Sequence, residues 1–370
     1  MKLSFQNLFY VLVFIFGLFA VLVLAKPVLI PLSMALFISF ILLPVVKKLE
    51  SWGLNRLLAA FVSLLMIFII IGGGIFLFSA QIISLSDQLD DFTEKIMSTL
   101  SDAVVFINSN INLIDDLNRD ELVENGKEWI KESSGSLVQS AFNSTAAFLT
   151  GLLATIIFTF LILIYREGLT KAFVAFGDDE NKRKIFGMLK NIQRVGKKYL
   201  SGMILLILIL GFAHSIALWI IGIDSPFLFG FLVGILAFVP YIGTVIGAII
   251  PILYAFMTAD SLWVPLVVIM WFWAMQIIES NFLNPKIVGS SVHVNALVAI
   301  LSLLIGSSVW GIAGMILFLP FAAMLKVICE EFDQLKPVAM LISSDISGDN
   351  KKEYKTPEWI EKTKRWFKKK

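Results

Sequence analysis

The 370-residue chain is 58% apolar and only 16% charged, whereas an ordinary soluble domain is about 45–50% apolar and about 25% charged. This composition excludes a water-soluble globular protein, because no soluble fold of this size could bury so many apolar side chains. The single cysteine, Cys329, excludes an intrachain disulfide and a cluster of thiolate metal ligands.

The apolar residues are gathered into long runs without charge. Each run is long enough for the roughly 17–25 helical residues that cross a bilayer, and none alternates apolar with polar residues as a spanning strand would. The sequence therefore predicts an all-α integral membrane protein with about eight membrane segments. The runs are Leu8–Ala25, Pro27–Val46, Leu57–Ala80, Ala146–Tyr165, Tyr199–Ile223, Ser225–Ala259, Ser261–Ile278 and Ile287–Leu325.

Charge in the connections predicts the orientation, since lysine and arginine in short loops mark the cytoplasmic side. Lys47, Lys48 and Arg56 place the connection after the second run inside. Residues 81–145 carry four basic against twelve acidic residues and belong outside, whereas residues 166–198 are strongly basic and belong inside. We expect a bacterial cytoplasmic membrane protein with a retained first helix and both termini in the cytoplasm.

Two connections have amphipathic patterns of their own. In the outside segment the apolar residues recur every three or four positions, which predicts a helix that needs a partner surface and makes a homo-oligomer plausible. In the inside segment Ile185 to Tyr199 give an apolar face edged with lysines, typical of a helix on an anionic leaflet. Beside a membrane span we do not expect these basic stretches to bind nucleic acid.

Two of the apolar runs are interrupted near their middle. Residues 225–259 are broken by Pro240-Tyr241-Ile242-Gly243, and residues 287–325 are broken by Gly306-Ser307-Ser308 with Gly311 and Gly314. Each is either a re-entrant hairpin, which would leave six full spans, or a pair of short tilted spans. Broken helices at corresponding places are the best sequence indicator of a transporter's binding site.

The densest polar cluster at membrane depth runs from Gln276 to Asn295. Gln276 and Glu279 share a helix face, and Pro285 is expected to end that helix and free backbone carbonyls. Glu279 is then a candidate for a proton- or sodium-coupled carboxylate, unless it simply pairs with Lys286 at the membrane boundary. His214 could relay protons, but a lone histidine among apolar residues more often serves as an interhelical hydrogen-bond partner.

Glycines in the spans have a structural explanation. Gly72-Gly73-Gly74 and Gly230-x-x-x-Gly234 are typical of close packing between membrane helices. Enzyme motifs are missing: there is no His-Glu-x-x-His pair, no Gly-x-Ser-x-Gly elbow and no phosphate-binding Gly-Lys-Ser/Thr loop. The sequence thus predicts neither an enzyme nor a protein with a cofactor or a metal.

Three blocks of residues carry a family resemblance. They run from Phe238 to Pro251, from Gln276 to Gly289 and from Leu301 to Pro320. The chain resembles the autoinducer-2 exporter family of PerM-like bacterial permeases, over its whole length in run order and most specifically in residues 200–328. The resemblance implies export of small molecules such as autoinducer-2, a hydroxylated furanone signal, although some members are described as sodium/proton antiporters.

From these patterns we expect five regions: residues 1–80, the acidic outside segment 81–145, residues 146–198, a transport core 199–328 and a basic tail 329–370. The predicted function is a secondary transporter or permease for a small solute. Cation/proton antiport is one alternative, and a non-transporting membrane scaffold is another. The predicted pathway residues are Pro240, Tyr241, Gly243, Gln276, Glu279, Asn281, Asn284, Pro285, His293, Asn295, Gly311 and Gly314.

Overall fold

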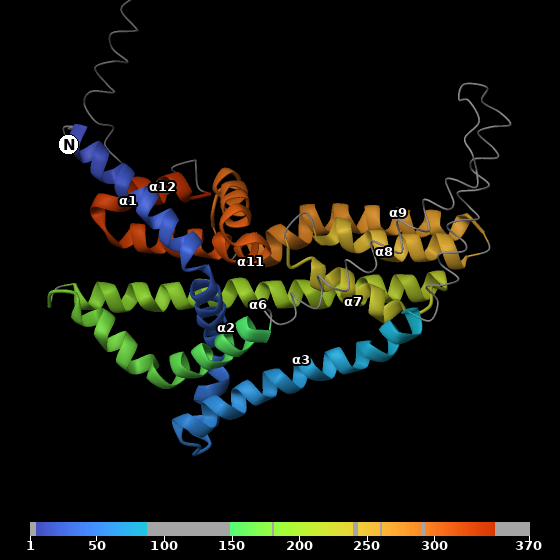
Figure 1. Ribbon diagram of the computed structural model, residues 1–370, viewed down its shortest axis with the longest axis horizontal. Helices are drawn as coiled ribbons and strands as arrows, with labels where there is room; N and C mark the ends of the chain where they lie inside the picture. Colours follow the sequence, from blue (N-terminus) through green and yellow to red (C-terminus); the bar gives the residue numbers. More distant parts are fainter. Residues whose placement is uncertain are drawn as a thin grey trace, which may run out of the picture.

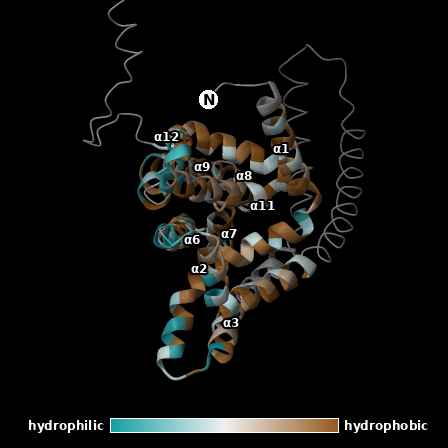
Figure 2. Ribbon diagram, turned by 90° about the vertical axis from the view of Figure 1, so that its left-hand side faces the viewer, coloured by the Kyte–Doolittle hydropathy of each residue, from teal (hydrophilic) through white to brown (hydrophobic). Residues whose placement is uncertain are grey.

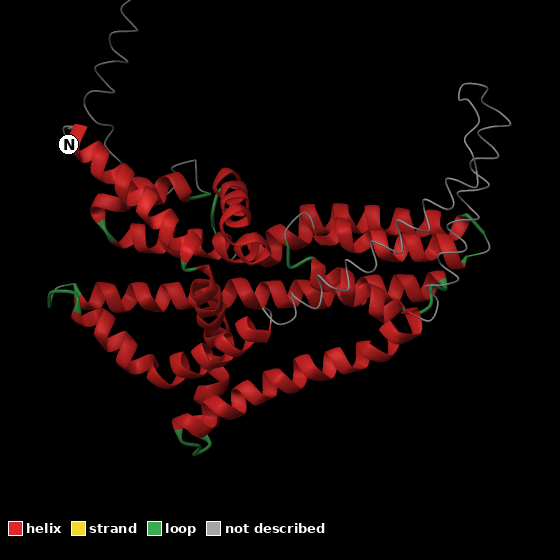
Figure 3. Ribbon diagram, viewed as in Figure 1, coloured by secondary structure: helices red, strands yellow, loops and turns green. Residues whose placement is uncertain are grey.

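A computed structural model describes residues 5–86, 149–179, 181–239, 243–259, 261–289 and 293–344. Helices make up nearly all of this described part (Figure 3), which confirms the predicted fold class. In a bilayer core a helix satisfies every backbone hydrogen bond within its own segment, so apolar runs of this length fold in this way. The helices are α1 (Phe5–Leu24), α2 (Lys26–Ser51), α3 (Arg56–Ser86), the helix Leu149–Ala175, α6 (Lys182–Ile221), α7 (Pro226–Leu236), α8 (Gly243–Thr258), α9 (Trp263–Ile278), η1 (Glu279–Gly289), α11 (Ala296–Glu331), η2 (Asp333–Leu335) and α12 (Lys336–Ile342).

Six helices in the described part are long and apolar enough to cross a membrane. They are α2, the first part of α3, the helix Leu149–Ala175, α6, α9 together with η1, and α11. Apolar residues cover much of their outer surface (Figure 2); Trp263, for example, is 75% exposed and Ile220 73%. Exposure on this scale is unfavourable in water and expected in lipid, so the chain is a multi-pass membrane protein.

Helix α6 is the axis of the fold. Beside its C-terminal half lie α7, α8 and α9, which run roughly along it, while α2 crosses it steeply (Figures 1 and 2). Helix α6 ends where Gly222 adopts a left-handed conformation, with φ of 91°, and its amide caps the carbonyls of Leu218 and Trp219. At about 1.5 Å per residue, the 40 residues of α6 extend about 60 Å, roughly twice the hydrocarbon thickness.

The contact between α6 and α7 depends on small residues. A Cβ atom on Gly234 would lie 2.8 Å from the carbonyl oxygen of Ile207 and 3.0 Å from the amide nitrogen of Gly211. A Cβ on Gly230 would collide with Ser215. The close-packing prediction for Gly230-x-x-x-Gly234 is therefore confirmed.

The same prediction is wrong for the glycine triplet in α3. Around Gly72, Gly73 and Gly74, no atom in the described part of the chain lies within 4 Å of where a Cβ would stand. Helix α3 runs apart from α6 at this level (Figure 1), and no described helix packs against the triplet.

The second interrupted run bends once, at Gly311. The helix continues through Gly306, Ser307 and Ser308, which were expected to belong to the break, and then turns at Gly311, whose φ of 60° and ψ of −136° are non-helical. Beyond the bend, Gly314 packs directly against the backbone of Gly306. Glycine is required here because a side chain would clash in both places.

Ion pairs join α2, α3 and the helix Leu149–Ala175 at one end of the molecule. Arg166 donates from Nη2 to both oxygens of Glu50, at 2.8 and 2.6 Å, while Arg56 pairs with Glu167. A buried cluster that includes Val46, Leu64 and Leu163 lies beside these pairs. The two basic connections, 47–56 and 166–181, are thus on the same side, as the charge pattern requires.

The basic segment after residue 181 is not a separate helix on the leaflet. It forms the first turns of α6, and its apolar positions Ile192 and Val195 pack against the protein core. Tyr199 is fully buried, and its hydroxyl donates to the carbonyl of Ile316 at 3.3 Å. The apolar face expected on lipid is instead covered by α11 and α2.

Several predictions concern residues outside the described part. These are the body of the acidic outside segment at residues 87–148 and the basic tail beyond Ser344. Pro240 and Tyr241, in the first break, also lie outside it.

Candidate functional site

The polar cluster lies on one face of α9 and its continuation η1. Phe272, Gln276 and Glu279 follow one another at steps of four and three residues, so they share a face of the helix. Phe272 and Glu279 are buried and Gln276 is half-buried. We call Gln276, Glu279 and the side chains that bond to them the polar stripe.

The helix does not end at Pro285, so that prediction is wrong. Residues Glu279–Gly289 form a π-helix that contains Pro285. Proline has no N–H and can donate neither the α-helical nor the π-helical backbone bond, so the helix continues past Pro285 with one backbone hydrogen bond missing. π-helical turns are rare and often occur at functional sites.

The structure joins the first break to this cluster. Helix α8 begins at buried Gly243, and the next residue, Thr244, donates from Oγ1 to Oε1 of Gln276 at 2.8 Å. Thr244 is itself buried. Thr244 and Gln276, which are 32 residues apart in the chain, thus meet at the start of α8.

Glu279 has a polar partner but no cation. Its side chain is only 4% exposed, and Oε1 accepts a hydrogen bond from Nδ2 of Asn284 at 3.1 Å. Lys286 is exposed, and within the described residues no basic group lies within 4 Å of the carboxylate. The alternative in which Glu279 pairs with Lys286 is therefore not what the structure shows.

Asn281 points away from the polar stripe. It is exposed, and its Nδ2 donates to the carbonyl of Ile277 at 2.9 Å. Ser280 likewise donates to the carbonyl of Gln276 at 2.8 Å. The carbonyls of Gln276 and Ile277 thus accept hydrogen bonds from side chains of the following turn.

His293 and Asn295 belong to a different arrangement. Asn295 caps α11 by accepting a hydrogen bond from the amide of Val298 at 2.9 Å. Its Nδ2 donates to the carbonyls of Leu341 in α12 and of Ser343, which follows that helix. The carbonyl of His293 accepts from Nζ of Lys326 at 3.0 Å. These residues fasten α12 to the start of α11.

The bend of the second run shares a core with the first break. Trp310, beside Gly311, and Ala237, at the end of α7, belong to one buried cluster with Met275 of α9. Trp310 also donates from Nε1 to the carbonyl of Leu22 in α1 at 2.9 Å. The bend at Gly311 thus lies next to a residue of the cluster that contains Met275, the neighbour of Gln276 in the chain.

The polar stripe lies deep along α6. Gly202 of α6 packs against the carbonyl of Ile287 in η1, and His214 stacks on Phe272 of α9. At about 1.5 Å per residue, these two points lie about 28 and about 10 Å from the C-terminal end of α6. With the C-terminal end of α6 set at one face of a hydrocarbon layer about 30 Å thick, both points lie inside that layer.

His214 makes the interhelical hydrogen bond that was predicted. Its Nδ1 accepts from Nε1 of Trp271 in α9 at 3.1 Å. Its side chain is only 3% exposed, so the bond holds α6 against α9 one turn above the polar stripe.

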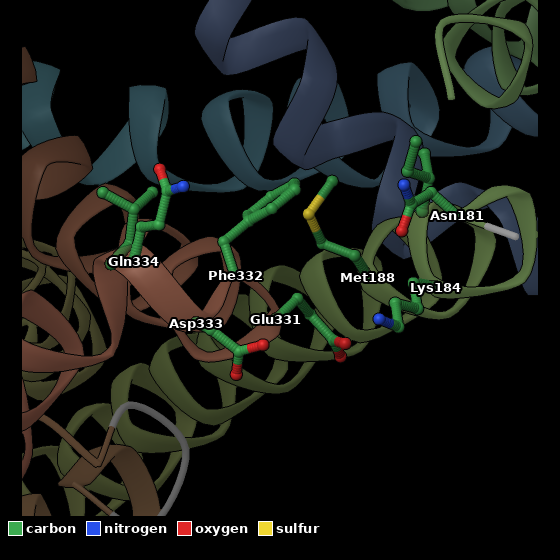
Figure 4. Close-up of a pocket in the computed structure, with 9 residues that line it drawn as sticks. Asn181, Lys184, Met188, Glu331, Phe332, Asp333 and Gln334 are labelled. Carbon is green, nitrogen blue, oxygen red and sulfur yellow. The ribbon is translucent and has the colours of Figure 1, made fainter. Parts of the chain in front are cut away.

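A separate cavity of about 420 Å³ lies between the start of α6 and the end of α11 (Figure 4). The carboxylates of Glu331 and Asp333 point to one side of it, and Phe332 and Met188 point to the other. A hydrogen bond from Lys336 lowers the pKa of the exposed Asp333 carboxyl, which is therefore ionised at neutral pH. The packed layer around Tyr199 separates this cavity from the polar stripe along α6.

Two residues that matter at these sites were not predicted. Thr244 could have been found, because it directly follows the glycine that opens α8. Lys326 could not, because its place depends on the bend at Gly311, which returns the second half of α11 to His293. Within the described residues, no group of three or more His, Cys, Asp or Glu side chains could hold a metal ion.

A multi-pass helical membrane protein with a polar stripe between broken helices has the architecture of a transport protein. Comparison with known proteins gives the family: residues 8–334 match the AI-2E family transporter model. The chain belongs to this family. The resemblance noted from the three sequence blocks is thereby confirmed.

Two relatives match over most of their length. YrrI of Bacillus subtilis (strain 168), provisionally named a transport protein, is 30% identical over 319 residues, which cover 84% of this chain and 88% of YrrI. The AI-2 transport protein TqsA of Escherichia coli (strain K12) is 26% identical over 326 residues, covering 86% of this chain and 90% of TqsA.

Proposed function

We propose that this protein carries a small hydroxylated solute across the bacterial cytoplasmic membrane through the polar stripe, with Glu279 as the proton-carrying group. One observation carries the proposal: the Glu279 carboxyl group is nearly fully buried, accepts a hydrogen bond from an amide and, among the described residues, has no basic group within 4 Å. Ionisable groups at membrane depth are costly and are usually kept for function.

The chemistry of the polar stripe favours a neutral polar solute. Thr244 offers a hydroxyl, Gln276 and Asn284 offer amides, and Glu279 offers a carboxylate. Such groups both donate and accept hydrogen bonds, as solute hydroxyls require. The name of TqsA supports autoinducer-2 as the first solute to test.

The distribution of basic residues supports an orientation in which the acidic segment lies outside the cell and both termini lie in the cytoplasm. The ion pairs of Arg166 and Arg56 unite the two basic connections at one end, and the positive-inside rule assigns that end to the cytoplasm. The basic start of α6 would then extend beyond the hydrocarbon on the cytoplasmic side.

Cation/proton antiport is the second candidate, because a lone buried carboxylate can bind a proton and a sodium ion in turn.

Pathway roles for the predicted residues outside the polar stripe remain part of the proposed transport function: Pro240, Tyr241, Asn281, Pro285, His293 and Asn295. A homo-oligomer in contact through the outside segment also stays a prediction.

The test uses purified protein in liposomes with an imposed pH gradient. Uptake of labelled autoinducer-2 and of sodium is measured for the wild type, for Glu279→Gln and for the control Glu331→Gln at the cavity. We expect saturable, pH-gradient-driven signal flux in the wild type and the control, and no response to the gradient in Glu279→Gln. Sodium flux without signal flux would transfer the proposal to antiport, and gradient-driven signal flux in Glu279→Gln would refute the role of Glu279.

A further inference from the structure

One ring nitrogen of His214 is engaged, and the other has no partner among the described residues. Nδ1 accepts the Trp271 N–H at 3.1 Å, and the imidazole stacks on Phe272 with ring centroids 4.7 Å apart and planes inclined by 26°. A neutral imidazole that accepts at Nδ1 must carry its proton on Nε2. Within the described residues, this Nε2–H makes no hydrogen bond.

A buried donor without a partner calls for an explanation. The His214 side chain is 97% buried, since its exposed fraction is 3%. Buried polar groups nearly always find a partner, and an exception often marks a water, an ion or a ligand that the protein binds. The Trp271 bond and the Phe272 stack hold the ring in one orientation, so the free N–H is fixed in direction.

The position of His214 relates it to the polar stripe. Phe272, on which it stacks, precedes Gln276 by one turn and Glu279 by two turns on the same face of α9. At about 1.5 Å per residue, these levels are about 6 Å and about 10 Å apart along the helix. His214 therefore extends the stripe by one level toward the C-terminal end of α6.

We propose that His214 is a solute-binding residue whose Nε2–H donates to an oxygen of the transported solute. This inference rests on the proposed function and deepens it. The solute would carry an acceptor oxygen that binds His214, and this oxygen would lie within about 10 Å of the part of the solute that contacts Glu279. An N–H dipole presents its positive end, so this level favours a hydroxyl or carbonyl oxygen and repels a bare cation. Trp271 is a positioning residue, because it fixes the tautomer that exposes the proton.

Matched substitutions separate binding from structure. In His214→Asn the amide oxygen can take the place of Nδ1 and accept from Trp271, but the distal donor is lost. In His214→Gln the amide nitrogen reaches about as far as Nε2 and keeps a distal donor. Trp271→Phe keeps the aromatic packing and removes only the hydrogen bond that fixes the tautomer.

The experiment measures labelled autoinducer-2 in two ways, as flux into proteoliposomes and as binding to detergent-solubilised protein by calorimetry. We expect His214→Asn to raise KM and Kd about tenfold, the equivalent of one hydrogen bond, with the maximal rate and thermal stability unchanged. His214→Gln should stay within about threefold of the wild type, and Trp271→Phe should fall between them.

Equal losses of affinity and stability in the Asn and Gln variants would overturn the proposal and leave His214 a packing residue. Saturable wild-type flux with the same KM in all variants would overturn the role of His214 alone and leave the proposed function standing. Wild-type sodium flux without any signal binding would overturn both.

Discussion

Replacing Gly234 by alanine tests how α7 is held against α6. The added Cβ would lie 2.8 Å from the carbonyl oxygen of Ile207 and 3.0 Å from the backbone of Gly211, whereas ordinary contact begins at 3.4 Å. The helices would have to separate by about 0.6 Å, the difference between 3.4 and 2.8 Å. Because both obstacles are backbone atoms, no side-chain rotation can relieve the clash.

Overpacking of this kind costs about 1–3 kcal/mol. We expect Gly234→Ala to lose about 2 kcal/mol of unfolding free energy, roughly a thirtyfold change in the folding equilibrium. The control is Gly72→Ala, where no described atom lies within 4 Å; it should be neutral or gain up to about 1 kcal/mol from better helix propensity.

Unfolding in mixed micelles of increasing SDS content, followed by tryptophan fluorescence, measures both free energies. Because α7 leads into the break before Thr244, the Gly234 variant should also transport more slowly. If Gly234→Ala and Gly72→Ala have the same unfolding free energy, the close approach of α6 and α7 is refuted.

Two further substitutions test contacts that hold other parts together. Asn295→Asp keeps the oxygen that caps α11 but loses the amide that donates to the carbonyl of Leu341. Hydrogen exchange should therefore rise in α12 while α11 stays protected. Equal exchange in both helices would show that Asn295 does not fasten α12 to α11. Arg166→Lys keeps the charge but loses the two-oxygen contact with Glu50 and should cost about 1–2 kcal/mol, measured in the same micelles, while an unchanged value would show the pair to be inert.

The sequence predicts the helices and the first break well because both depend on local chemistry. Long apolar runs have one favourable backbone conformation in lipid, and the Pro240–Gly243 sequence cannot continue a helix. The close contact at Gly230 and Gly234 was also predictable, since glycine at this spacing removes the side chains between two helices.

Other features depend on contacts between distant residues and could not be read locally. Pro285 was expected to end its helix, yet the backbone continues through it as a π-helix, and no simple sequence pattern distinguishes the two outcomes. The apolar face at Ile192 would suit lipid or protein equally well; the return of α11 after Gly311 decides in favour of protein. The hydrogen bonds of Asn295 to α12 were not predictable either, because they join residues 46 and 48 positions apart in the chain.

Stability alone does not explain the burial of Glu279. An uncompensated buried carboxylate is destabilising, and an apolar side chain of similar size would pack between α9 and its neighbours with no such penalty. Asn284 offsets only part of this cost, since one amide cannot satisfy two carboxylate oxygens. Thr244 and His214 place further polar atoms on the same face from α8 and α6, two helices with no need to share a polar layer for packing. A carboxylate and polar groups converging from three helices at membrane depth are what a solute passing between those helices would require.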